Sequence, residues 1–213
     1  MTFYRIVRLV VAGGSRILWR AAIVGRDRLP RAGGYVLAPS HRSMMDIPFI
    51  AAVTPRRIRY MGKASVFRIP VLGTLFRLLG GFPVARDGTD RKAVRDSVAM
   101  LQAGEVVVVY PEGTRQNGPK IQPLQPGAAY LALRAGVPIV PVGMAGTEEI
   151  VRSRARRLAP GFARVAVVVG EPIVPPARST PSVPRAAVDE LTARLHEALQ
   201  TAFDTAYTIR DSN

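Results

Sequence analysis

A histidine and an aspartate five positions apart are the first side chains in this sequence whose types suit acid–base chemistry. His41 and Asp46 lie in the stretch APSHRSMMDIP. A carboxylate bonded to one imidazole nitrogen fixes the tautomer and stabilises the cation that forms when the other nitrogen takes up a proton. The pair therefore fits a general base acting on a hydroxyl group. It also fits an aspartate that caps a helix beside an incidental histidine.

The spacing of this pair sets a condition on the backbone. Two residues five positions apart on one straight α-helix point about 140° away from each other, so their side chains do not meet. They can touch only if His41 lies in a turn and Asp46 lies near the start of the helix that follows. The sequence meets this condition, because a strand-like apolar run ends at Pro39 and a helical pattern follows, with Ser43 or Asp46 as its predicted cap.

A second polar cluster, YPEGTR, follows another apolar run at residues 110–115. Gly113 lets backbone N–H groups approach an anion, and the guanidinium of Arg115 can bind two phosphate oxygens. The pattern indicates an anion site, although a plain glycine turn in which Glu112 pairs with Arg115 explains the same residues. Arg86, at the end of GGFPVAR, is either another phosphate ligand or the partner of a nearby aspartate.

The elements around these clusters alternate between strands and helices. Apolar runs predict strands at 34–40, 57–62, 81–86, 105–113, 137–143 and 164–170. Helical spacing predicts helices after Ser43, over 64–81 with a break at Pro70, over 89–104, over 127–136 and at the C-terminus. The alternation predicts an α/β fold, a sheet covered by helices, in which the working residues lie in loops at strand ends. The three polar clusters each follow a predicted strand, so we expect them to converge on one crevice.

The charge of the chain points to anionic partners. Its 213 residues carry a net charge of +15, and 27 of the 30 basic residues are arginines. Arginine suits nucleic acid, an anionic membrane or phosphorylated small molecules. We expect no nucleic-acid partner, because no recognised binding motif is present and no basic stretch is interleaved with stacking aromatic residues. The absence of cysteine excludes disulfides, thiolate metal sites and cysteine nucleophiles.

The N-terminal segment combines apolar and basic residues. No apolar run reaches the ~18–20 residues needed to cross a bilayer, and the pattern of a secretory signal is missing. Phe3, Ile6, Leu9, Ile17 and Trp19 are interspersed with arginines. This predicts a basic amphipathic helix in a membrane interface over residues 1–24, or alternatively a first helix packed on the domain.

The rest of the chain divides into two predicted parts. Residues 25–176 form the main domain, and residues 177–213 form a proline-rich linker and an amphipathic C-terminal helix packed on that domain. Five apolar side chains share one face of this helix. They are Val188, Leu191, Leu195, Leu199 and Phe203.

Together these motifs resemble the glycerolipid acyltransferase family, of the 1-acyl-glycerol-3-phosphate acyltransferase type. HRSMMD is similar to its His-x4-Asp box, GGFPVAR to its Gly-x3-apolar-x-Arg block, PEGTR to its Glu-Gly-Thr-Arg motif and VPIVPVG to its apolar Val-Pro block. The first and third motifs, about seventy residues apart, are specific in combination. The resemblance covers roughly residues 20–175. Pro83 stands where many members have a bulky apolar residue, which we expect to alter local shape and not chemistry.

The resemblance implies a glycerol-3-phosphate acyltransferase-like fold and a reaction. An acyl group would pass from acyl-CoA or acyl carrier protein to the sn-2 hydroxyl of 1-acyl-glycerol 3-phosphate, giving phosphatidic acid. By the resemblance His41 is the general base and Asp46 orients it, while Arg86 and Arg115 contact the acceptor phosphate. The residues that help to shape or complete the same pocket are Glu112, Gly113 and Thr114.

Several further expectations accompany this resemblance. We expect no bound cofactor or metal, and a location on the cytoplasmic face of an anionic cell membrane. A lyso-ornithine lipid, another lysophospholipid or glycerol 3-phosphate is an alternative acceptor, and an inactive lipid-surface adaptor is an alternative class. The apolar stretch 61–82 is expected either to line a groove for the acyl chain or to pack in the core.

Overall fold

A single mixed sheet organises the computed structural model, which describes residues 2–84, 90–150, 163–177 and 182–212. Its seven strands lie in the order β1-β7-β6-β2-β5-β3-β4. The strands are β1 (Ala22–Val24), β2 (Tyr35–Pro39), β3 (Ile58–Lys63), β4 (Gly81–Val84), β5 (Val106–Val108), β6 (Ile139–Ala145) and β7 (Ala166–Val169). The central strands are completely buried and consist mostly of valine, isoleucine and leucine, as expected for a sheet covered on both faces.

Strand direction determines which loops share an edge of the sheet. Strands β6, β2, β5, β3 and β4 are parallel to one another, whereas β7 is antiparallel to β6 and β1 is parallel to β7. The loops after β2, β5 and β6 therefore emerge at the same edge. The observed architecture confirms the predicted α/β fold with a mixed sheet covered by helices.

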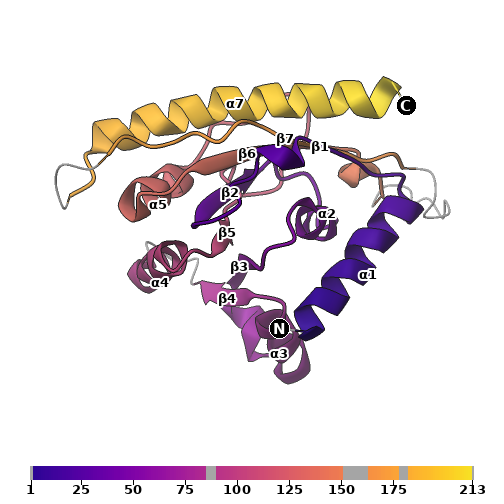
Figure 1. Cartoon of the computed structure of the whole chain (residues 1–213), viewed down its shortest axis with the longest axis horizontal. Coiled ribbons are helices and arrows are strands. Elements are labelled where there is room, and N and C mark those ends of the chain that lie inside the picture. Colours follow the sequence, from indigo (N-terminus) through magenta and orange to yellow (C-terminus); the bar gives the residue numbers. More distant parts are fainter. Residues whose placement is uncertain (1, 85–89, 151–162, 178–181, 213) are drawn as a thin grey trace.

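Helices cover both faces of the sheet (Figure 1). The α-helices are α1 (Thr2–Leu18), α2 (Asp46–Val53), α3 (Pro70–Leu78), α4 (Arg91–Gln102), α5 (Gly127–Ala135) and α7 (Arg185–Ser212), and two short 3-10 helices are η1 (Arg26–Arg28) and η2 (Ala64–Arg68). One core cluster joins α2 to side chains such as Leu37 and Val108, and a second joins α4, α5 and α7 to Val36 and Val107. These alternating strand residues therefore fill the two faces of one sheet.

Helix α7 spans one face of the sheet, as Figure 1 shows. All five apolar residues predicted to share its inner face are buried. It approaches β6 so closely that a Cβ atom on Gly143 would lie 2.2 Å from the backbone of Ala202. Only glycine is compatible with this helix–strand contact.

Several element predictions need correction. Strand β1 was not predicted; it pairs with β7, so the segment 1–24 includes a strand of the sheet as well as helix α1. The predicted break at Pro70 is present: η2 ends at Arg68, and Pro70 opens α3 at its first position, where its missing N–H costs nothing. The cap of α2 is Met45 and makes no side-chain capping bond, so neither Ser43 nor Asp46 has the predicted role.

Candidate active site

His41 and Asp46 are in direct contact. His41 lies in the turn after β2 and Asp46 opens α2, which is the backbone arrangement that the spacing requires. His41 Nδ1 is 2.8 Å from Asp46 Oδ2. The histidine side chain is 18% exposed, whereas the aspartate side chain is completely buried. The ring therefore has its Nδ1 edge fixed inside the protein and a small part of its surface available to a ligand.

The carboxylate of Asp46 is held by the turn that precedes it. Its Oδ2 also accepts hydrogen bonds from the backbone N–H groups of Arg42 (2.8 Å) and Ser43 (3.0 Å). Its Oδ1 accepts one from the hydroxyl of Thr147 (2.6 Å), which follows β6 and is buried. These bonds explain the failed cap prediction, because the carboxylate faces the preceding turn and not the N–H groups of α2. Hydrogen bonds to a buried carboxylate stabilise its charged form.

The ring of Tyr110 lies against the imidazole. The two ring centroids are 4.1 Å apart and the planes are inclined by 29°. Burial, and secondarily the charge of Asp46, raises the pKa of the Tyr110 hydroxyl well above its usual value. This hydroxyl is protonated at neutral pH, and it has no hydrogen-bond partner within the described part of the chain. Tyr110 therefore limits the orientation of the imidazole by contact alone.

Glu112 joins the two polar loops from a completely buried position. Its Oε2 accepts from the backbone N–H of His41 (2.9 Å), and its Oε1 accepts from that of Gln122 (3.3 Å). Its ion-pair partner is Arg42, at 3.6 Å, and not Arg115 as one interpretation of the sequence had it. The glutamate thus fixes the position of the histidine backbone relative to the loop after β5.

Arg42 is a buried structural residue that sequence reasoning did not single out. Its guanidinium lies 4.3 Å from the ring centroid of Phe203 on α7. It also donates to the carbonyl groups of Gly118 (3.4 Å) and Lys120 (3.3 Å). In the sequence, the only indication of a role for Arg42 was its position next to His41. Its burial could not be foreseen, because arginine is rarely buried unless it is paired. Arg42 therefore connects the histidine turn, the loop after β5 and the C-terminal helix.

The remaining predicted residues of the loop after β5 are exposed. Gly113 has a φ of 73°, a left-handed conformation that favours glycine. Thr114 donates from its hydroxyl to the carbonyl of Arg115 at 3.2 Å. The Arg115 side chain is exposed and forms no ion pair with any residue that the structure describes. Arg86 lies outside the described residues.

An apolar groove of about 1230 Å³ lies on the face of the sheet that α4, α5 and α7 cover. Its lining includes Val94 and Val98 of α4, Leu131 of α5 and Val188 of α7. Arginines of the same helices also line it. Its Gln125 end reaches the loop after β5, because the N–H of Gln125 bonds to the carbonyl beside Glu112. The groove therefore reaches the loop after β5 on the face of the sheet covered by α4, α5 and α7.

The stretch 61–82 lies mostly outside this groove. Only Met61 of that stretch lines it, among the residues that the structure describes. On α3, Val71 is 84% exposed, and Leu75 and Leu78 are also exposed. These three side chains therefore lie neither in the wall of this groove nor in the core, whereas Phe76 of the same helix packs against the buried ring of Phe67. Across the described ranges no three His, Asp or Glu side chains gather in a way that could hold a metal ion.

Comparison with known proteins identifies the kind of domain that holds this site. The acyltransferase family profile matches residues 20–145, more than half of the chain and the whole of the His41–Asp46 and Glu112–Arg115 region. The chain belongs to the acyltransferase family. It is 28% identical over 125 residues to the 1-acyl-sn-glycerol-3-phosphate acyltransferase of Bacillus subtilis, and 33% identical over 118 residues to the human beta enzyme of that name.

These alignments cover part of each protein. They include 58% and 54% of this chain, and only 62% and 42% of the Bacillus and human proteins. The crystal structure of the 1-acyl-sn-glycerophosphate acyltransferase PlsC from Thermotoga maritima has the same fold, with a TM-score of 0.72 and 21% sequence identity over 95% of this chain and 80% of that one. None of the helices in the described part of the acyltransferase is long and apolar enough to cross a membrane.

Proposed function

We propose that this acyltransferase moves a fatty acyl group from a thioester to the sn-2 hydroxyl of 1-acyl-glycerol 3-phosphate, giving phosphatidic acid. The observation that carries the proposal is the contact of 2.8 Å between His41 Nδ1 and the buried carboxylate of Asp46. The names of the Bacillus and human relatives support this choice of acceptor.

The geometry suggests a direct transfer with His41 as general base. Because Nδ1 faces Asp46, Nε2 takes the proton of the acceptor hydroxyl as its oxygen attacks the thioester carbonyl carbon. Asp46 stabilises the imidazolium that forms. The tetrahedral intermediate then collapses, the carbon–sulfur bond breaks, and the departing thiolate receives the proton from Nε2. The ester and the free thiol are released without a covalent acyl-enzyme.

Arg115 is our candidate for the acceptor phosphate. It is exposed, it has no acidic partner among the described residues, and it follows a glycine turn at the same sheet edge as His41. A guanidinium binds two phosphate oxygens in a planar fork. Thr114 belongs to the same exposed turn, and Glu112 shapes the pocket by holding the two loops together. Arg86 stays a predicted second phosphate ligand.

The apolar groove is our candidate for the acyl chain of the donor. Its volume of about 1230 Å³ exceeds the roughly 300–1,000 Å³ of common ligand pockets. Each methylene group that leaves water contributes about 0.8 kcal/mol to binding. The arginines that line it, including Arg91 and Arg95, suit the phosphates of coenzyme A or an acidic carrier protein. This placement replaces the α3 stripe that the sequence suggested.

The first helix provides the proposed contact with the cytoplasmic face of an anionic membrane. Several of its large apolar side chains are exposed, among them Leu9 (61%), Val10 (68%) and Ile17 (80%). Exposed apolar side chains beside arginines suit a helix that lies in the plane of a lipid interface. Trp19, which follows the helix, instead packs edge-on against Phe49 at a ring distance of 5.8 Å. The segment is therefore attached to the domain on one side and free on the other.

A product assay tests the reaction and the acceptor together. The purified full chain is supplied with acyl-CoA or acyl carrier protein, and with 1-acyl-glycerol 3-phosphate, lyso-ornithine lipid, other lysophospholipids or glycerol 3-phosphate. Release of thiol and the mass of the product are measured. We expect phosphatidic acid from the first acceptor. If only another acceptor is acylated, the proposed acceptor is wrong but acyl transfer stands. If thiol is released at the same rate with and without every acceptor, the acyl-transfer proposal is wrong.

A further inference from the structure

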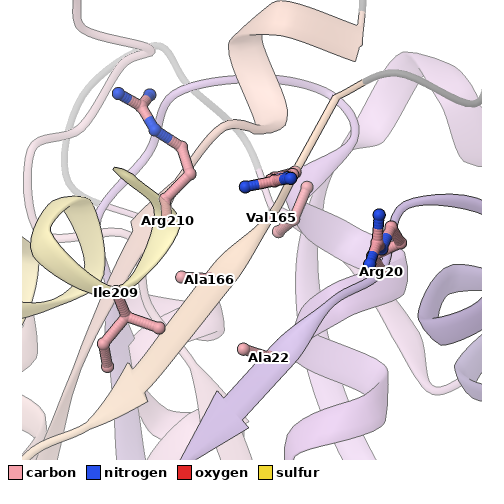
Figure 2. Close-up of a pocket in the computed structure, with 7 residues that line it drawn as sticks. Arg20, Ala22, Val165, Ala166, Ile209 and Arg210 are labelled. Carbon is pink, nitrogen blue, oxygen red and sulfur yellow. The ribbon is translucent and has the colours of Figure 1, made fainter. Parts of the chain in front are cut away.

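A small basic pocket lies apart from the groove and from His41. It has a volume of about 230 Å³, and three arginines line it: Arg20, Arg164 and Arg210. We call it the arginine pocket. Figure 2 shows Arg210, from α7, and Arg20, before β1, on opposite sides, with Val165 between them. Three chain segments that are distant in sequence thus bring guanidinium groups to one place.

Two of these arginines have no acidic partner among the described residues. Arg210 is paired, with Asp211 at 2.7 Å and Glu149 at 3.0 Å. Arg20 and Arg164 are exposed and form no such pair. Like charges that line one pocket repel each other, and an anion bound there reduces that repulsion while accepting charge-assisted hydrogen bonds. Glu148 also lies 3.9 Å from Arg210, so the guanidinium groups available to an external anion are those of Arg20 and Arg164.

The backbone at Arg20 is unusual. Its φ of 44° makes it the one non-glycine residue with a positive φ in the described ranges. Residues other than glycine rarely adopt a positive φ, and those that do are often at functional positions. The turn places Arg20 at the pocket directly after α1, instead of allowing the helix to continue. Ile17 and Leu18, which end that helix, are 80% and 49% exposed.

The pocket shares a sheet edge with the histidine site. Strand β7 is antiparallel to β6, so its first residue, Ala166, pairs with the last residue of β6, Ala145. Because β6 is parallel to β2, that end of the sheet is also where His41 follows β2. A flat anionic surface that faces this edge can meet the pocket and the exposed end of α1 together.

We propose that the arginine pocket binds the phosphate group of a phospholipid at a site separate from the acceptor site. A guanidinium fork binds phosphate in two-point fashion, and the neighbouring exposed apolar residues suit the lipid that carries it. The pocket is smaller than common pockets for drug-sized ligands, which are roughly 300–1,000 Å³, so it accommodates a headgroup and not an acyl chain. Inorganic phosphate offers the same chemistry without the lipid.

The test compares two double variants of the full chain that lose the same charge. Arg20→Ala/Arg164→Ala removes the unpaired arginines, and Arg31→Ala/Arg194→Ala removes two exposed arginines elsewhere that form no ion pair among the described residues. Binding of soluble short-chain phosphatidylglycerol, and separately of inorganic phosphate, is measured by titration calorimetry. Circular dichroism confirms that each variant is folded. If the alanine variant unfolds, Arg20→Gln/Arg164→Gln replaces it.

We expect the pocket variant to bind the lipid about tenfold or more weakly than wild type, and the control variant to bind it within about twofold. If the pocket variant also binds inorganic phosphate more weakly while the control variant does not, this supports the site and identifies free phosphate as a sufficient ligand. Equal losses in both double variants would show diffuse attraction and overturn the proposal, as would a wild-type chain that binds neither probe. Because the readout is binding, this result is independent of acyl-transfer activity.

Discussion

Replacing Asp46 by asparagine separates the charge of this residue from its geometry. The asparagine oxygen can occupy the place of Oδ2, where it accepts from His41 Nδ1 and from the backbone N–H groups of Arg42 and Ser43. Its amide NH2 then occupies the place of Oδ1 and donates to the Thr147 hydroxyl, which can accept as well as donate. Asp46→Asn should therefore keep the imidazole in place and remove only the negative charge.

The size of the effect follows from the contact distance. A hydrogen bond to a charged group contributes about 1.5–3 kcal/mol, and each 1.36 kcal/mol of the barrier is a tenfold change in rate. We expect kcat/KM of Asp46→Asn to fall by about 10- to 150-fold, with little change in thermal stability. His41→Ala loses the base itself, for which about 10²- to 10⁴-fold is typical. Asp46→Asn should consequently retain more activity than His41→Ala.

Thr147→Val provides the matched partner for a double-mutant cycle. Alone it removes one hydrogen bond to Asp46, and charged hydrogen bonds contribute about 1.5–3 kcal/mol. In Asp46→Asn/Thr147→Val the buried amide NH2 faces a methyl group and loses its hydrogen-bond partner. No hydrogen bond to that NH2 then fixes the orientation of the asparagine amide. We expect the double variant to lose more activity than the two single losses predict together. Thr147→Ser should behave like wild type, because it keeps the hydroxyl.

The assay is the rate of thiol release from acyl-CoA in the presence of acceptor, with thermal unfolding of each variant as the control for folding. Additive losses across the cycle would refute the assigned role of Thr147. An Asp46→Asn variant as inactive as folded His41→Ala would refute the inference that geometry and charge are separable here.

Four further changes test other parts of the proposal. Folded His41→Ala should transfer almost no acyl group, and near-normal turnover would remove His41 from the mechanism. Arg115→Lys keeps the charge but loses the fork, so the KM for the acceptor should rise more than that for the donor; the reverse pattern would assign Arg115 to the donor. Val98→Trp should shift preference towards shorter acyl donors, whereas equal loss at every length would place the chain elsewhere. Leu9→Ser/Ile17→Ser should weaken binding to anionic vesicles without lowering stability, because both side chains are exposed; unchanged flotation would contradict the proposed contact of α1.

Most strands and helices could be predicted because each depends on interactions among residues that are close together in the sequence. The run GYVLAPS has no charged residue and is polar only at its last position, Ser40, and the β2 strand that it forms is buried on both faces. Asp90 precedes a helical pattern, and its side chain does accept the N–H of Ala93 as an N-cap. Strand β1 escaped prediction because Ala22–Val24 has only three residues and its pairing with β7 connects positions more than 140 apart. No local pattern encodes such a pairing.

The site was predictable in part for the same reason. The spacing of His41 and Asp46, together with the strand before them, was enough to anticipate their contact. Thr147 and Arg42 were not anticipated, because their roles depend on a loop after β6 and on a helix at the other end of the chain. The stretch 61–82 left two interpretations open because exposed and buried apolar stripes look alike in sequence: Leu75 is 40% exposed at a spacing typical of a core position.

The contact between Arg42 and Phe203 also has a consequence for biosynthesis. The turn that contains the histidine leaves the ribosome well before Phe203, which follows Arg42 by 161 residues. Gln200 of the same helix accepts the N–H of Ile121 in the loop after β5. A nascent chain therefore cannot complete these contacts until α7 has been synthesised and has docked. Until then, growing chains should lack a fully assembled catalytic turn.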